Sequence, residues 1–179
     1  MQKERTMSTG YMVRTALLAA VLCIVGPLAL PIGAVPVSLT TLVLYFLVYL
    51  LDGKHALISY MVYFLLGLVG LPVFSGFSGG VGKLAGPTGG YLIGFFLMIP
   101  CAAGMLKHSG KSRMGQALGL IFATLIAYVF GVTWFVVSMS CDIYYALTVG
   151  VLPFLIGDFL KIALAVWIGP ALRKRMRVV

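Results

Sequence analysis

Two ionisable residues, Asp158 and Lys161, interrupt an apolar stretch near the end of the chain. In a membrane helix each would cost about 2.5–3.5 kcal/mol at the bilayer centre unless it faced protein or water. Their i, i+3 spacing stacks the carboxylate and the ammonium group on one helix face, about 4.5 Å apart along the axis. We interpret them as polar groups that receive a ligand. The alternative is a self-neutralising pair that only locks helix packing.

A glycine-rich segment from Gly70 to Phe95 supplies further candidate site residues. Lys83 is its one charged residue, and we expect it to meet a ligand carboxylate, with a solvated lysine at a loop tip as the alternative. Glycine lets the backbone approach a ligand closely. Thr88 is placed to cap the next helix, whose first N–H groups attract anions.

Three aromatic residues of the same segment, Phe74, Phe77 and Tyr91, are candidates for the apolar wall of a pocket. The alternative for each is an aromatic belt at the membrane interface, where such rings are enriched.

The composition indicates which elements must position these groups. Of 179 residues, 61% are hydrophobic and only 9% are charged, far from the averages of soluble proteins. Apolar runs recur along the chain, each near the roughly 20 residues that cross a hydrocarbon core. We predict an all-α integral membrane protein with a single domain, 1–179. Its six transmembrane helices are expected at about 11–30, 35–51, 56–71, 90–106, 116–138 and 151–172.

The basic residues predict the orientation, because Lys and Arg in short loops stay in the cytoplasm. With both termini inside, all of the 13 basic residues except Lys83 and Lys161 fall on the cytoplasmic side. The net charge of +9 then reads as an orientation signal with attraction to anionic lipid, and not as a nucleic-acid surface. In this topology Ser38, Thr88 and Asp158 belong to outer halves of helices. The predicted pocket therefore faces outward and suits a small, partly apolar anion.

Three segments together resemble the BioY family, the biotin-binding S component of energy-coupling factor transporters. They read AVPVSLTTL, PVFSGFSGGVGKLAGPTGGYLIGF and VLPFLIGDFLKIALA. The combination of GPTGGY with G-D-x-x-K is distinctive, and the resemblance extends over nearly the whole chain. It implies a six-helix membrane protein whose first and third loops cap an outward-facing site.

The resemblance also implies roles for individual residues. Asp158 and Lys161 would contact the ureido ring of biotin, while Lys83 and the neighbouring backbone would hold the valerate end. The family usually has Gln at the position of Thr40. The other candidate biotin-binding residues are Gly86, Pro87, Thr88, Gly89, Tyr91, Phe74, Phe77 and Ser38.

Partners follow from the same resemblance. Ala16 and Ala20 match the A-x-x-x-A pattern with which the first helix of such components packs on a transmembrane coupling protein, although small residues at this spacing also serve packing within one chain. Two ATPase subunits of the partner complex would use the ATP, and this chain would bind biotin without a cofactor. We expect it in the bacterial cytoplasmic membrane as a multi-pass protein.

The same residues fit other function classes less well. The segment GGVGK lacks the flanking residues of a phosphate-binding P-loop. Both histidines fall at cytoplasmic turns, and the three cysteines are scattered, so we predict no catalytic residue, no metal site and no enzyme. The remaining alternative is a solitary or proton-coupled secondary transporter of a small carboxylate vitamin, with Asp158 as the proton relay.

Overall fold

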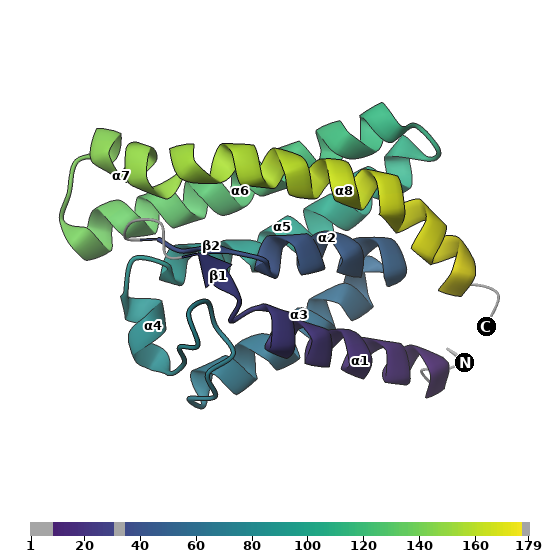
Figure 1. Ribbon diagram of the computed structural model, residues 1–179, viewed down its shortest axis with the longest axis horizontal. Helices are drawn as coiled ribbons and strands as arrows, with labels where there is room; N and C mark the ends of the chain where they lie inside the picture. The colour runs from purple at the N-terminus through teal and green to yellow at the C-terminus, as the bar shows by residue number, and fades with distance from the viewer. Residues whose placement is uncertain (1–8, 31–34, 177–179) are drawn as a thin grey trace, which may run out of the picture.

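The computed structural model describes residues 9–30 and 35–176 of the chain. Most of them are helical (Figure 1). In chain order the helices are α1 (Thr9–Val25), α2 (Thr40–Leu50), α3 (Gly53–Leu68), α4 (Val81–Ala85), α5 (Gly89–Ser109), α6 (Arg113–Met139), α7 (Ile143–Gly150) and α8 (Leu152–Met176). Two short strands, β1 (Ala29–Leu30) and β2 (Val37–Ser38), pair antiparallel between α1 and α2.

Among the described residues, three helical stretches are long and apolar enough to cross a membrane, namely Gly89–Ser109, Arg113–Met139 and Ile143–Met176. Many of their large apolar side chains are exposed on the surface of the protein, as expected where the surrounding solvent is lipid. The expected all-α membrane class is therefore confirmed at this level.

Each of the six expected segments contains one helix, but the boundaries differ. The first segment is helical only to Val25, because Pro27 lacks an N–H group and restricts the residue before it. The second begins at Thr40, since the residues before it pair as β2. Periodicity also missed α4, which has only five residues, and α7, which begins after the capping side chain of Asp142 in the connection that follows α6.

The helices form layers in Figure 1. α6, α7 and α8 lie along one side, α1 and α3 along the other, and α2 and α5 lie between them. Both termini lie at the end opposite α7. α2 and α5 therefore contact the helices on both sides.

Glycines allow α5 and α6 to approach closely. A Cβ added at Gly90 would overlap Trp134 and the Phe130 carbonyl of α6, and one added at Gly131 would overlap the ring of Tyr91. Small residues at helix contacts are the usual means of packing in lipid, where the hydrophobic effect does not drive association. The α5–α6 contact thereby positions Tyr91 toward the middle of the molecule.

We predict that Gly90→Ala destabilises the protein by about 1–3 kcal/mol, because the added methyl group must displace the backbone of α6. Thermal unfolding of the purified protein in detergent measures this. Gly104→Ala on the same helix is the matched control, since a Cβ there meets nothing within 4 Å. The control should melt at the same temperature as the parent or higher, and equal destabilisation by both substitutions would contradict the close contact.

Candidate functional site

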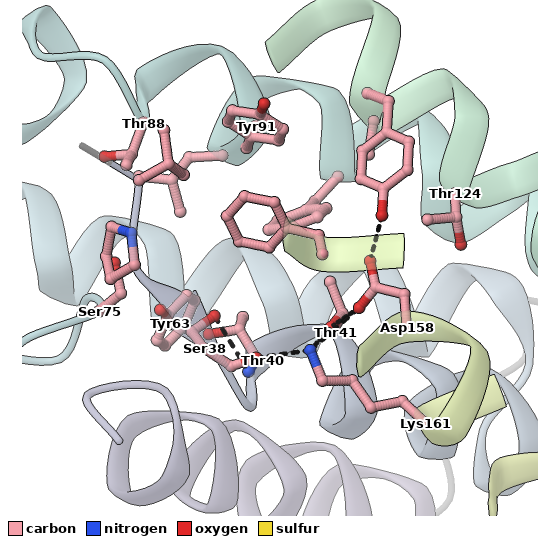
Figure 2. A pocket seen from close by; sticks show the side chains of 17 residues that line it. Ser38, Thr40, Thr41, Tyr63, Ser75, Thr88, Tyr91, Thr124, Asp158 and Lys161 are labelled. Carbon is pink, nitrogen blue, oxygen red and sulfur yellow. Dashed lines mark hydrogen bonds and ion pairs between the residues drawn. The ribbon is translucent and has the colours of Figure 1, made fainter. Parts of the chain in front are cut away.

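A cavity of about 60 Å³ lies between α2, α5, α6 and α8. Its lining contains one acid, one lysine, apolar side chains and nine residues that carry a hydroxyl group. Figure 2 shows Asp158 and Lys161 at one end of this cavity and Thr88, Ser75 and Tyr63 at the other. This volume holds a few water molecules, whereas sites for small molecules usually measure about 300–1,000 Å³. A ligand therefore has to widen the cavity as it enters.

The two predicted charges of α8 form an ion pair at one end of the cavity. The Lys161 Nζ lies 2.9 Å from the Asp158 Oδ1, and both side chains are buried. The spacing thus stacks them as expected. They compensate each other, and they also line the cavity, so the two interpretations of the pair are not exclusive.

Residues from three other elements complete the surroundings of the pair. The Lys161 ammonium donates to the Ser38 carbonyl (2.8 Å) and to the Thr41 hydroxyl (3.0 Å). The Thr41 hydroxyl donates to Asp158 Oδ1 (3.3 Å), and the Tyr128 hydroxyl donates to Asp158 Oδ2 (2.6 Å). These contacts attach β2, α2 and α6 to α8.

The ion pair has one hydrogen-bonding position left for a ligand. An ammonium group has three donors, and all three of Lys161 are used by Ser38, Thr41 and Asp158. A carboxylate has about four acceptor positions, of which Lys161, Thr41 and Tyr128 occupy three. One position on Asp158 Oδ2 remains, and it suits an N–H group of a ligand.

The other end of the cavity holds two buried hydroxyl groups, Thr88 Oγ1 and Tyr63 OH. Neither has a hydrogen-bond partner among the described residues, and both residues line the cavity. A buried polar group left in this state costs about 1–3 kcal/mol. Two such groups in one cavity indicate that a polar ligand atom or water completes their hydrogen bonding.

Thr88 differs from its expected role as a helix cap. It occupies the N-cap position of α5, but its side chain makes no capping hydrogen bond. Its backbone is helical (φ −93°, ψ −7°), whereas capping side chains normally come from residues in the extended region. The hydroxyl is consequently left for the cavity.

The structure brings together five of the eleven residues expected to bind the ligand, namely Ser38, Thr88, Tyr91, Asp158 and Lys161. The Tyr91 hydroxyl donates to the Gly150 carbonyl (2.6 Å). Thr40, where the family usually has Gln, lines the cavity as well.

The other third-loop residues lie outside this lining. Phe74 is fully buried in the core against Gly67 and the ring of Tyr63, while Phe77 is exposed. The Gly86 carbonyl accepts the Trp134 indole N–H (3.0 Å). Pro87 lies in the turn before α5, and Gly89 is the first residue of that helix.

Lys83 lies in α4, next to the cavity but not in its lining. Its ammonium group donates to the Ser75 carbonyl (3.2 Å), and Ser75 does line the cavity. Burial lowers the pKa of the Lys83 side chain. A ligand carboxylate can therefore bind the Lys83 ammonium group only if Lys83 gives up its hydrogen bond to the Ser75 carbonyl.

Sequence reasoning missed Thr41, Tyr63, Ser75, Thr124 and Tyr128 as lining residues. The signal for Tyr128 was a hydroxyl group in the middle of a long apolar run. The signal for Thr41 was its place in one of the three segments that carry the family resemblance. Neither signal indicates that both side chains reach Asp158, because that depends on how the helices pack.

Ala16 and Ala20 are exposed on α1 and do not line the cavity. Within the described residues no group of three His, Cys, Asp or Glu side chains is placed to hold a metal ion.

The chain is similar to several known proteins. A profile of the BioY family matches residues 1–178. The chain is 34% identical to biotin transporter BioY2 of Lactococcus lactis over 157 residues, which cover 88% of this chain and 86% of that protein. It is 33% identical to biotin transporter BioY of Thermotoga maritima over 164 residues, covering 91% and 95%.

A solved structure also matches the fold. It is the crystal structure of the S-component for biotin from an ECF-type ABC transporter, with a TM-score of 0.86 and 28% identity. The match covers 94% of this chain and 95% of that one.

Removing one partner of the buried pair should destabilise the protein strongly. Lys161→Met leaves the Asp158 carboxylate without its cation, and we expect a loss of about 3–5 kcal/mol. Thermal unfolding in detergent measures the loss. Combining the change with Asp158→Asn removes the uncompensated charge and should restore much of the stability.

Lys54→Met is the control, because Lys54 is exposed near the start of α3. It should leave the melting temperature unchanged. If Lys161→Met melts like this control, the pair does not contribute to the stability of the fold.

Proposed function

The chain belongs to the BioY family, and from this premise we propose that it is the high-affinity biotin-binding component of an energy-coupling factor vitamin importer. It captures biotin, and partner subunits drive the uptake. The observation that carries the proposal is a cavity with one open acceptor position on a carboxylate at one end, and at the other two buried hydroxyl groups that have no hydrogen-bond partner in the described part of the chain. The match to the S-component for biotin supports it.

The ureido ring of biotin fits the Asp158 end. An N–H group of the ring takes the remaining acceptor position on Asp158 Oδ2. The ureido oxygen needs a donor, and Lys161 has none to spare. Binding there thus replaces the bond from Lys161 to Ser38 or to Thr41, which couples ligand entry to the position of β2 or α2. Leu92, Phe95 and Phe154 provide apolar surface for the fused rings.

The valerate carboxylate fits the opposite end. Thr88 and Tyr63 supply hydroxyl donors, and the start of α5 supplies partial positive charge. Lys83 contributes its full charge from beside the cavity, by exchanging the Ser75 carbonyl for the ligand. In this proposal Gly86, Pro87 and Gly89 shape the third loop, and Phe74 and Phe77 support it from outside the cavity.

The proposed topology has six transmembrane helices, both termini in the cytoplasm, and a cavity that opens to the outside of a bacterial cytoplasmic membrane. The distribution of basic residues supports this orientation. Ala16 and Ala20 form an exposed small-residue face on α1, which suits close packing with a transmembrane coupling protein. Two ATPase subunits bound to that protein would use the ATP.

A proton-coupled secondary transporter is the alternative. Asp158 accepts hydrogen bonds from Tyr128 and Thr41 and is paired with Lys161, so a proton relay through Asp158 would require these contacts to rearrange. Liposomes that contain the purified chain alone distinguish the two. Biotin uptake driven by a pH gradient in such liposomes would support the alternative.

We predict that Asp158→Asn lowers biotin affinity by about 100-fold, because the acceptor for the ureido N–H loses its charge. Isothermal titration with the detergent-purified protein measures it. The matched control is Asp142→Asn, which changes an exposed carboxylate that caps α7 and should bind biotin normally. Unchanged affinity in folded Asp158→Asn protein would refute the ligand role of Asp158.

The valerate end is tested by Thr88→Val, which removes one hydroxyl group with little change in volume. We expect about tenfold weaker binding of biotin, and a smaller change for biotin amide, which lacks the carboxylate charge. Lys83→Gln should likewise weaken the binding of biotin more than that of biotin amide if the Lys83 charge reaches the ligand. Thr133→Val, at an exposed position of α6, is the control. Equal losses for biotin and its amide would argue against a carboxylate at this end.

A further inference from the structure

A second hollow, of about 510 Å³, lies at another place in the fold, between the turn from α5 to α6 and the last turns of α8. Figure 1 shows these two segments at the same end of the molecule, opposite α7. Four of its eight lining residues are cationic: Lys111, Arg113, Arg173 and Lys174. We call it the basic hollow. It shares no lining residue with the biotin cavity.

The floor of the basic hollow is built from buried, hydrogen-bonded residues. The Tyr49 hydroxyl donates to Gln116 Oε1 (3.0 Å), and Gln116 Nε2 donates to the Gly110 carbonyl (2.8 Å). The ring of Tyr49 also lies where a side chain at Gly169 would be, so α8 approaches α2 closely just before Pro170. These contacts hold the two cationic segments at a set separation.

The cations of the basic hollow have no carboxylate partner among the described residues. The ion pairs found there join Lys161 with Asp158 and His55 with Asp52. The third acid of the described residues, Asp142, caps α7. Four like charges around one hollow repel each other, and a bound anion relieves that repulsion.

Helix ends compensate these charges only in part. Arg173 and Lys174 lie in the last turn of α8, where the helix dipole favours a cation. Arg113 is the first residue of α6, where the dipole disfavours one. The helix dipole therefore does not compensate Arg113, whose charge adds to the repulsion within the hollow.

We propose that the basic hollow binds the phosphate-bearing headgroup of an anionic phospholipid. Trp167 is exposed on α8, seven residues before Lys174 and thus on the same helix face, about 10 Å further along the axis. Met114 and Leu118 are exposed on α6 in the turns that follow Arg113. These apolar side chains offer a surface to acyl chains, with the headgroup held by the cations at the helix ends. Basic pockets between membrane helices bind anionic headgroups by this combination.

The test uses the full chain purified in detergent and mixed with phosphatidylglycerol or phosphatidylcholine, with retained lipid counted by native mass spectrometry. The parent protein should retain phosphatidylglycerol preferentially. Lys111→Gln combined with Lys174→Gln removes two exposed cations of the hollow, and we expect at least about tenfold weaker retention of phosphatidylglycerol. Should this variant fail to fold, Arg113→Gln with Arg173→Gln tests the same hollow.

The matched control is Lys107→Gln combined with Arg175→Gln. It removes the same charge from exposed positions at the same end of the molecule, outside the hollow, and should retain phosphatidylglycerol like the parent. Equal retention by all three proteins overturns the proposal, as does an equal loss in the variant and the control, which would indicate a diffuse charge effect.

A separate arm distinguishes the source of the phosphate group. Inorganic phosphate is added without lipid, at an ionic strength matched with chloride, and thermal unfolding is recorded. Stabilisation by free phosphate equal to that by phosphatidylglycerol, and lost in the Lys111 and Lys174 variant, would overturn the assignment to a lipid. Little stabilisation by phosphate alone supports it. These measurements contain no biotin, so their outcome is independent of the proposed transport function.

Discussion

The ion pair between Asp158 and Lys161 is the interaction on which the arrangement of the cavity depends. A buried charge must be compensated at close range, and the pair alone leaves polar atoms on both groups unused. Ser38, Thr41 and Tyr128 use most of them. Satisfying two charges on α8 thereby fixes where β2, α2 and α6 lie, and the cavity is the space enclosed by the elements drawn together in this way.

The two ends of the cavity differ in how completely their polar groups are satisfied. At the Asp158 end the ammonium group is saturated and one acceptor position is left. At the Thr88 end two buried hydroxyl groups have no partner among the described residues. A ligand gains most if it brings a donor to the first end and an acceptor to the second. This asymmetry gives the cavity a direction, and it matches a molecule with N–H groups at one end and a carboxylate at the other.

The sequence predicted the parts of this site that depend on local spacing. The stacking of Asp158 on Lys161 follows from helix periodicity, and the membrane class follows from composition. It did not predict contacts that join distant segments, such as Thr41 with Asp158, which lie 117 residues apart. The third loop shows the same limit. The Gly76 N–H bonds to the Pro27 carbonyl (3.0 Å) and the Gly80 N–H to the Gly67 carbonyl (2.7 Å), a path that buries Phe74 away from the cavity and that no local pattern encodes.

The small number of acidic residues affects both the cavity and the basic hollow. The whole chain has 13 basic residues and 4 acidic ones, and the acids at Asp52, Asp142 and Asp158 are already used in two helix caps and one buried pair. Lys161 obtains a carboxylate because it is buried, where an unpaired charge is most costly. Most of the remaining cations are therefore compensated by helix ends, water and anions from outside the chain. In the proposed topology these excess cations lie on one side of the bilayer, where anionic headgroups are the nearest counter-anions.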